Sequence, residues 1–257
     1  MTETTTETDL GERLRLMEKA NLQEWFDHQI ATLPHLPMPN KVLRLTDLHA
    51  GDGGIGKHID PLKCSGMESA ILDLLDSHQD YTWVLDEVWD VWRSYFLKAC
   101  ENAHQKLCGR IEKQRQRIHR AVPMCYELIS NHVMDELSFL LPAAIFEGFN
   151  KKFFFYHGHI GDWPNDEGWK IGRAMVRMAD ELGIDPHSSP HASSIDRHAT
   201  VRSLMLDLAY NNTDWEIFTG HTHFYEERGY YNSGSPITGK LTYFEIIEGE
   251  IQGKGDV

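Results

Sequence analysis

Apolar positions recur at helical spacing in the first part of the chain and in shorter, denser runs after it. From Leu10 to about Leu33, apolar side chains return every three or four positions with charges between them, which predicts an amphipathic helix. The polar, acidic tip before this helix is expected to be disordered. The Pro-rich run LPHLPMPN (33–40) ends the helix. This arm, 1–40, either packs on the domain formed by 41–257 or makes a homodimer contact; packing is favoured.

Short apolar runs in the second region predict strands, and helical patterns separate the early ones. The first strand is Val42–Leu45, in which Arg44 is expected to be an edge or ion-paired residue. Further strands are predicted at 82–85, 124–129, 153–156, 216–218, 229–231 and 241–247, and helices at 66–77, 94–120, 136–149 and 167–182. This order indicates an α/β layered domain with mixed sheets. Ligands gather outside the carboxyl ends of strands in such sheets, so functional groups are expected there.

Composition narrows the class of protein. The chain has 257 residues, 41% of them hydrophobic, which is ample for a sizeable core. Its net charge of -14 argues against a protein that coats nucleic acid, because that affinity comes largely from Lys and Arg. A small phosphorylated substrate remains compatible with this net charge, because metal ions can neutralise the charge of its phosphate. The four cysteines form no C-x-x-C pair, and we see neither a signal peptide nor a membrane span, so a soluble cytoplasmic protein is expected.

Side chains that commonly bind metals follow five successive predicted strands. In chain order, the strand ends carry Asp47 and His49, then Asp86, Glu87 and Asp90, then Asn131 and His132, then His157 and His159, and finally His221 and His223. Each pair alone fits a helix cap or a turn, but five such ends in order favour one common site. Carboxylate, amide and imidazole groups without a thiolate suit Mn, Fe, Zn, Co or Ni. Their number indicates two ions that share a carboxylate.

This ordered set resembles the motifs of the calcineurin-like metallophosphoesterases. The family pattern D-x-H, G-D-x-x-D, G-N-H-D/E, H and G-H-x-H corresponds here to Asp47-x-His49, DEVWD, Asn131-His132, His157 and Gly220-His221-x-His223, followed by the turn YYNSGSP. The resemblance extends from Val42 to Ile251. The stretches DEVWDVW and HGHIGD are further similar to the branch that includes the UDP-2,3-diacylglucosamine hydrolases. The resemblance implies a four-layer α-β-β-α sandwich of two mixed sheets flanked by helices.

Three positions depart from the family pattern. Asp86-Glu87 stands where the family has Gly-Asp. The shared carboxylate is therefore Glu87 if Asp90 keeps its family position, or Asp86 if the spacing is stretched by one residue; we favour Glu87. Ser130 replaces a glycine in a turn that favours positive φ. Val133 follows the Asn-His pair where the family has an acid. Such changes either tune the choice of metal or mark a site that has lost activity.

The resemblance also implies a mechanism, that of a dinuclear phosphohydrolase. One ion takes Asp47, His49, Glu87 and His223, and the other shares Glu87 and takes Asn131, His157 and His221. Manganese is the favoured metal. A metal-bound hydroxide attacks phosphorus in a phosphomonoester or phosphodiester. His132 stabilises the developing charge and protonates the leaving oxygen. Asp90 either orients His132 or simply caps a helix.

The segment 162–200 carries further candidate residues for substrate binding. It contains Trp163, Arg173, His187, His191, Arg197 and His198. This segment is either a lid over the metals or a solvated loop. Two residues are candidate substrate contacts: Arg197 in this segment, and His159, which lies just before the segment begins.

Two alternatives to a small-molecule phosphohydrolase follow from the same residues. The first is a degraded scaffold that only binds, but retention of the Asn131-His132 pair favours activity. The second is a nuclease, because basic side chains of the predicted helix 94–120 fall on one face at alternating gaps of four and three. These are Lys106, Arg110, Lys113, Arg117 and Arg120. A solvated face is the favoured interpretation of that stripe.

Overall fold

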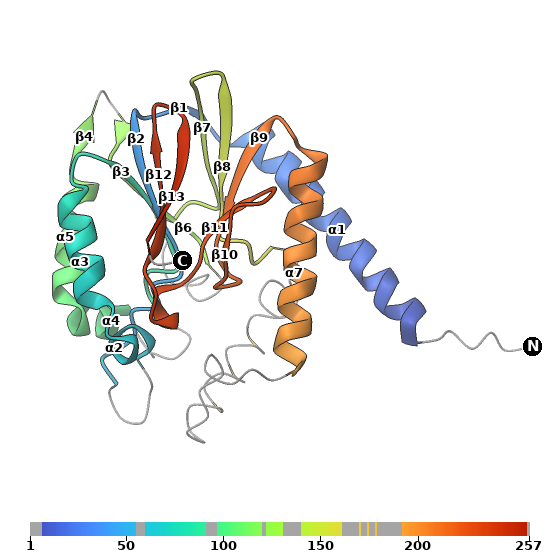
Figure 1. The fold of residues 1–257 in the computed structure, drawn as a ribbon, viewed down its shortest axis with the longest axis horizontal. Helices are drawn as coiled ribbons and strands as arrows, with labels where there is room; N and C mark the ends of the chain where they lie inside the picture. The colour runs from blue at the N-terminus through green and yellow to red at the C-terminus, as the bar shows by residue number, and fades with distance from the viewer. Residues whose placement is uncertain are drawn as a thin grey trace, which may run out of the picture.

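Two β-sheets lie face to face and helices cover both outer faces (Figure 1). The structure is a computed structural model that describes residues 7–54, 60–90, 97–119, 122–130, 140–160, 170, 174, 178 and 192–255; within these ranges, the side chains of 7–15 and 192–198 are not described. The layers follow one another as helices, sheet, sheet and helices. This arrangement confirms the predicted four-layer α-β-β-α sandwich of two mixed sheets.

The first sheet has the strand order β13-β12-β2-β3-β6. Its parallel centre consists of β2 (Lys41–Leu45), β3 (Thr82–Asp86) and β6 (Cys125–Leu128). Strands β12 (Thr242–Ile247) and β13 (Glu250–Gly255) extend it as an antiparallel pair beside β2. The carboxyl ends of β2, β3 and β6 therefore open toward the same edge.

The second sheet has the order β1-β7-β8-β9-β11-β10. Its members are β1 (His35–Pro37), β7 (Ala144–Gly148), β8 (Lys151–Phe155), β9 (Trp215–Thr219), β11 (Tyr231–Ser233) and β10 (Tyr225–Glu226). Strands β8, β9 and β11 are parallel, whereas β7 and β10 each run antiparallel to a neighbour. A separate two-stranded ribbon joins β4 (Ile118–His119) and β5 (Val122–Pro123).

Alternation along the strands builds the cores on the two faces of each sheet. In β3, Val84 packs between the sheets, whereas Trp83 and Leu85 pack against helices. The layer between the sheets is rich in aromatic side chains and contains Val42, Val84, Tyr126, Leu128, Phe146, Phe153, Phe155, Phe218, Phe244 and Ile246. Consecutive buried residues whose side chains point alternately to the two faces are what a sheet covered on both faces requires.

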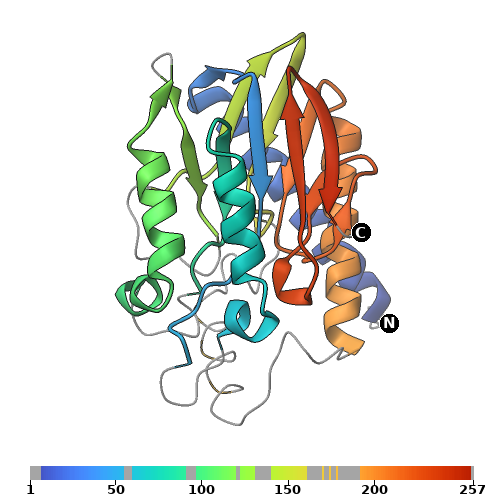
Figure 2. The ribbon, with the colours of Figure 1, turned by 60° about the vertical axis from the view of Figure 1, so that its left-hand side comes forward.

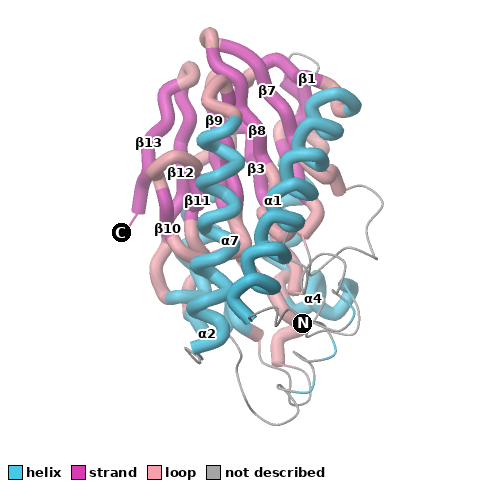
Figure 3. The backbone as a smooth tube through the Cα atoms, turned by 90° about the vertical axis from the view of Figure 1, so that its right-hand side faces the viewer, coloured by secondary structure: helices cyan, strands magenta, loops and turns pink. Residues whose placement is uncertain are grey.

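Helices from different parts of the chain cover the two outer faces. Over the first sheet lie α3 (Glu68–Ser77) and α5 (Gln105–Arg115), with the shorter α2 (Pro61–Ser65) and α4 (Leu97–Ala103) near the strand ends (Figure 2). Over the second lie α1 (Glu7–Thr32) and α7 (Ala192–Asn211), shown in Figure 3. A single 3-10 turn, Pro236–Thr238, follows β11. None of the helices among the described residues has the length and apolar character needed to cross a membrane.

The N-terminal helix packs on the domain. Leu22 and Phe26 are buried, and the Phe26 ring meets that of Phe154 in β8 at a centroid distance of 4.7 Å. Lys19 Nζ lies 3.2 Å from Asp207 Oδ2 of α7. The division of the chain into an arm and a domain, and a homodimer contact through this helix, stay predictions.

The structure differs from the predicted elements in several places. The predicted helix 136–149 ends in a strand instead, because Ala144–Gly148 forms β7 and pairs with β8. The predicted helix 94–120 breaks at His104 and ends at Arg115, so the basic stripe does not run along one helix. Helix α7 was not predicted, and its first part falls in the segment 162–200 that was interpreted as a lid or a loop. The predicted helix 167–182 lies almost wholly outside the described residues.

Candidate metal centre

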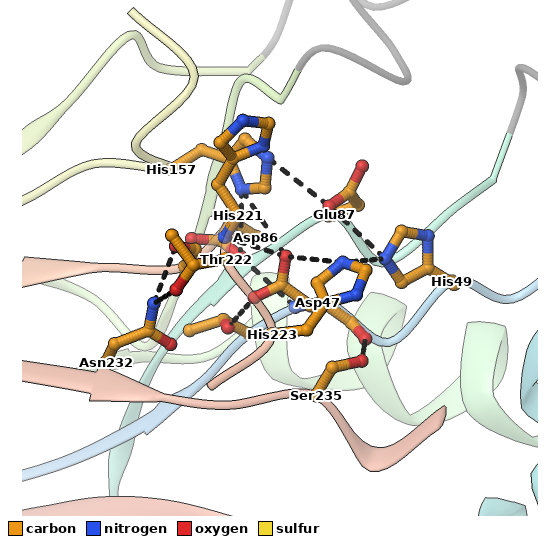
Figure 4. A network of polar contacts seen from close by, with 12 residues as sticks. Asp47, His49, Asp86, Glu87, His157, His221, Thr222, His223, Asn232 and Ser235 are labelled. Carbon is orange, nitrogen blue, oxygen red and sulfur yellow. Dashed lines mark hydrogen bonds and ion pairs between the residues drawn. The ribbon is translucent and has the colours of Figure 1, made fainter. Parts of the chain in front are cut away.

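The strand ends of both sheets bring acidic and imidazole side chains together (Figure 4). Asp47 and His49 follow β2, Asp86 ends β3 with Glu87 next to it, His157 follows β8, and His221 and His223 follow β9. All four strands present their carboxyl ends here, where α/β sheets characteristically bind ligands. The predicted convergence of these strand ends is therefore present in the structure.

Two groups of donor atoms overlap through Asp47. The ligand atoms of Asp47, His49, Glu87 and His223 all lie within 4.8 Å of one another, and those of Asp47, Asp86 and His157 do so as well. This donor set of carboxylate oxygens and imidazole nitrogens suits a borderline divalent ion. Asn131 and His132, predicted as a ligand and as the proton donor, lie outside the described residues.

Glu87 lies between two histidines that come from different sheets. Its Oε2 is 3.4 Å from His49 Nε2 and 3.3 Å from His157 Nε2. His223 Nε2 is in turn 2.9 Å from His49 Nε2 and 3.7 Å from Asp47 Oδ1. The Nε2 atoms of His49 and His157 therefore both lie close to the same carboxylate oxygen.

The other ring nitrogen of each of these histidines faces an outer carboxylate. His49 Nδ1 is 3.9 Å from Asp90 Oδ2, and His157 Nδ1 is 3.4 Å from Asp86 Oδ1. Histidines that bind metals commonly have such a carboxylate behind them, because it fixes the tautomer and the orientation of the ring. Asp90 was predicted to orient His132; among the described residues it faces His49.

Asp47 is held by several backbone and side-chain contacts. Thr46 Oγ1 donates to its Oδ2, and the His221 backbone N–H donates to its Oδ1 at 2.9 Å. Ser235 Oγ donates to the Asp47 carbonyl at 2.6 Å. A Cβ at Gly220 would lie 2.6 Å from Asp47 Oδ2, so only glycine leaves room for this carboxylate. The position of Asp47 is fixed before any ligand arrives.

Asn232 organises the loop that carries the last two histidines. Its Nδ2 donates to the Gly220 carbonyl at 2.7 Å and to Thr222 Oγ1 at 3.0 Å. Its Oδ1 accepts a hydrogen bond from the Gly234 N–H at 2.8 Å. One buried amide thus ties the strand that follows the GHTH motif to the motif itself (Figure 4). Asn232 was noticed in the sequence only as part of a family-like turn.

Five of the candidate ligands have left-handed backbone conformations. The φ values are +54° at Asp47, +49° at His49, +43° at Glu87, +69° at His221 and +61° at His223. Such conformations cost side-chain-bearing residues about 1–3 kcal/mol each, and they gather at functional sites. Ser130, by contrast, is buried and is not among the described residues with a positive φ.

Burial makes this acidic cluster costly without a cation. Asp47, Asp86 and Asp90 are fully buried and Glu87 is 2% exposed. Burial and the neighbouring Asp47 carboxylate, followed by Asp86 and Asp90, raise the pKa of Glu87 well above its usual value. Burial also raises the pKa of Asp86, although the adjacent Arg44 opposes this. Divalent cations would relieve the repulsion, so the residues present fit the metals that the sequence implies.

The remaining predicted residues are placed only in part. His221 contributes a ring whose centroid is 5.2 Å from that of His157. His159, predicted to contact substrate, is 3% exposed, and its ring centroid is 5.4 Å from that of His157. Arg197 belongs to α7, but its side chain lies outside the described part of the structure.

The fold and the site together define a two-sheet sandwich with a candidate divalent-metal centre. No family model matches the chain, and no curated protein matches it. Similar solved structures include a Vps29 single mutant from Entamoeba histolytica, 13% identical, with a TM-score of 0.39 over 84% of this chain and 98% of that one. They also include a conserved uncharacterized protein from Streptococcus pneumoniae, described as a predicted phosphoesterase, 10% identical, with a TM-score of 0.36 over 85% and 99%.

A third similar structure, determined by NMR, is a Thermotoga maritima protein that is 14% identical, with a TM-score of 0.36 over 85% of this chain and 99% of that one. At these TM-scores the likenesses are too weak to carry an argument about family or activity.

Proposed function

We propose that this chain is a calcineurin-like metallophosphoesterase that binds two divalent ions and hydrolyses a phosphoester. The observation that carries the proposal is the arrangement around Glu87. Its Oε2 lies within 3.4 Å of His49 and within 3.3 Å of His157, and Asp47 belongs to both groups of donor atoms. Two ions held about 3.5–4 Å apart need shared carboxylates of this kind.

We assign Asp47, His49, Glu87 and His223, whose donor atoms lie close together, to the first ion. The family motifs assign Glu87, His157, His221 and Asn131 to the second ion. Glu87 is favoured over Asp86 as the shared ligand, because the Asp86 carboxylate is already ion-paired with Arg44. When bound, the ions supply Lewis acidity toward the phosphoryl group and the attacking water. Manganese is the expected ion, and Fe, Zn, Co and Ni suit the same donors.

Other side chains act on the substrate. His132 protonates the leaving oxygen, a contribution of about a hundred- to ten-thousand-fold in rate. His159 and Arg197 are the proposed substrate contacts. The substrate is a small phosphomonoester or phosphodiester rather than nucleic acid, because the net charge of -14 disfavours a long polyanion. The proposed location is the cytoplasm.

The test is hydrolysis of nitrophenyl phosphate and of bis(nitrophenyl) phosphate by the full chain with added Mn²⁺. A UDP-sugar belongs in the panel, because DEVWDVW and HGHIGD resemble the UDP-2,3-diacylglucosamine hydrolase branch. Turnover that needs a divalent ion and disappears in His157→Ala supports the proposal. The matched control is His28→Ala, which removes an exposed imidazole of α1 and is expected to leave turnover unchanged. Metal binding without turnover on any ester would instead indicate a binding protein.

A further inference from the structure

A buried ion pair lies directly behind the candidate metal centre. The Arg44 side chain is fully buried, and its Nη2 donates to Asp86 Oδ2. The same guanidinium donates to the Val84 carbonyl at 3.4 Å and to the Tyr156 carbonyl at 3.3 Å. Arg44 therefore connects β2 to β3 and, across the two sheets, to the residue that immediately precedes His157.

The two oxygens of Asp86 have different surroundings. Oδ2 is paired with Arg44, whereas Oδ1 accepts a hydrogen bond from the Asp47 backbone N–H at 3.3 Å and lies 3.4 Å from His157 Nδ1. On the other side of the imidazole, Nε2 is 3.3 Å from Glu87 Oε2. The ring of His157 is thus held between an outer carboxylate and an inner one.

The arrangement repeats on the other side of the centre. His49 has its Nε2 at 3.4 Å from the same Glu87 oxygen and its Nδ1 at 3.9 Å from Asp90. Asp86 is therefore placed behind the ring of His157 in the same way as Asp90 is placed behind the ring of His49. A carboxylate behind a ligating histidine keeps the proton on Nδ1 and leaves the Nε2 lone pair for the ion.

We infer that Arg44 and Asp86 are positioning residues for His157. Asp86 accepts the Nδ1 proton of His157, so that Nε2 binds the ion beside Glu87, and Arg44 fixes Asp86 in that orientation. The inference rests on the proposed function, because it concerns the metal centre proposed above. It also assigns Asp86 a role outside the ligand set, although Asp86 belongs to the group of donor atoms that contains Asp47 and His157.

The test compares two double variants that remove both charges of the Arg44–Asp86 pair together. Removing only one partner would strand the other charge in the core, which is strongly destabilising, whereas replacing a whole buried pair is often tolerated. Arg44→Met/Asp86→Ala removes the acceptor for His157. Arg44→Met/Asp86→Asn removes the same charges but keeps a carbonyl oxygen as an acceptor. Thermal unfolding of both variants in chelator shows whether they are folded.

The first readout is the affinity for Co²⁺, measured by titration together with the visible spectrum of the bound ion. We expect Arg44→Met/Asp86→Ala to bind the ion next to His157 about 10–100-fold more weakly than the wild type, the usual effect of losing such a partner. The asparagine variant is expected to recover most of this affinity. Equal affinity and equal spectra for the alanine variant and the wild type would overturn the inference.

The second readout is the proton position on His157 in the Zn²⁺-loaded protein, from long-range proton–nitrogen NMR correlations. We expect the proton on Nδ1 and the metal on Nε2. Two results would make Asp86 a ligand and overturn the inference. One is metal bound to Nδ1 of His157, and the other is an asparagine variant that loses one ion as completely as His157→Ala does.

These results separate the inference from the proposed function. If the wild type binds ions without hydrolysing any ester, the hydrolase proposal fails, and the affinity of the alanine variant relative to the wild type still decides the role of the Arg44–Asp86 pair. If the wild type hydrolyses esters and the alanine variant binds ions as tightly, only the inference fails. If the wild type binds no divalent ion, both fail.

Discussion

Replacing Glu87 with glutamine is expected to stabilise the metal-free protein and to abolish its stabilisation by divalent ions. Glu87 is buried beside Asp47, Asp86 and Asp90, and these carboxylates disfavour its ionised form. Glutamine has nearly the same shape but no charge, so it removes the repulsion without leaving a cavity. The same change removes the ligand that faces both His49 and His157.

The size of the effect follows from the distance between the carboxylates. The ligand oxygens of Asp47 and Glu87 lie within 4.8 Å of each other. Two unit charges at that distance repel by about 3.5 kcal/mol at an effective dielectric constant of about 20. Proton uptake by the wild-type cluster relieves part of this repulsion, so we expect Glu87→Gln to add about 2 kcal/mol to the free energy of unfolding. For a domain of this size that corresponds to about 4–8 °C in melting temperature.

The assay is thermal unfolding with a chelator and then with Mn²⁺. The wild type is expected to gain about 2.7 kcal/mol for each ion bound at a concentration of about a hundred times its Kd, whereas Glu87→Gln gains little. Glu24→Gln, an exposed change in α1 with the same effect on net charge, controls for charge alone and should behave like the wild type. The reasoning is refuted if Glu87→Gln melts at or below the wild-type temperature in chelator, or if Mn²⁺ stabilises it as much as the wild type.

Three further predictions test other parts of the site and the fold. His132→Ala is expected to keep the metal content, measured by elemental analysis, and to lose most of the turnover; unchanged turnover would remove it from the mechanism. Gly220→Ala places a Cβ 2.6 Å from Asp47 Oδ2 and is expected to weaken Mn²⁺ binding in calorimetry. The control is Gly109→Ala, whose added Cβ meets nothing within 4 Å; it should leave Mn²⁺ binding unchanged and stabilise α5 by about 0.5–1 kcal/mol. Burial opposes charge on His104, but its contact with Asp60 outweighs this and raises its pKa above 6.5. The stabilisation that this contact gives is complete below pH 6.5 and is lost as the pH rises through the raised pKa of His104. Between about pH 6 and about pH 9, the melting temperature of the wild type should therefore fall by more than that of His104→Gln. Parallel melting curves for these two proteins would contradict that assignment.

The sequence predicted the layered sandwich and brought most of the residues of the candidate metal centre to one sheet edge. Each ligand motif directly follows a short apolar run, and parallel strands bring such run ends together. Asp47, His49, Glu87, His157 and the two histidines after β9 could therefore be placed at one site before their distances were known.

Long-range pairing decided what local patterns could not. The apolar residues Ala144–Gly148 fit the end of a helix as well as a strand, and only pairing with β8 makes them β7. Helix α7 carries Val201, Leu204, Met205 and Leu208 at helical spacing, and these side chains pack in the core beside the second sheet.

The pairing of Arg44 with Asp86 was likewise not evident from the sequence. Arg44 was expected to be an edge or ion-paired residue, and it is ion-paired but lies on a central strand. The partner depends on the register of β2 and β3, which sets Arg44 opposite Val84 and two residues from Asp86. No pattern along a single strand carries that information.

The central claim is that this chain holds two divalent ions through the ligands around Glu87. The most direct measurement is the number of Mn²⁺ ions bound per chain, determined by calorimetric titration of the metal-free protein and compared with His157→Ala. We expect two ions for the wild type and a single remaining tight site for the variant. Binding of no ion by the wild type, or the same stoichiometry and affinity in both proteins, would contradict the claim.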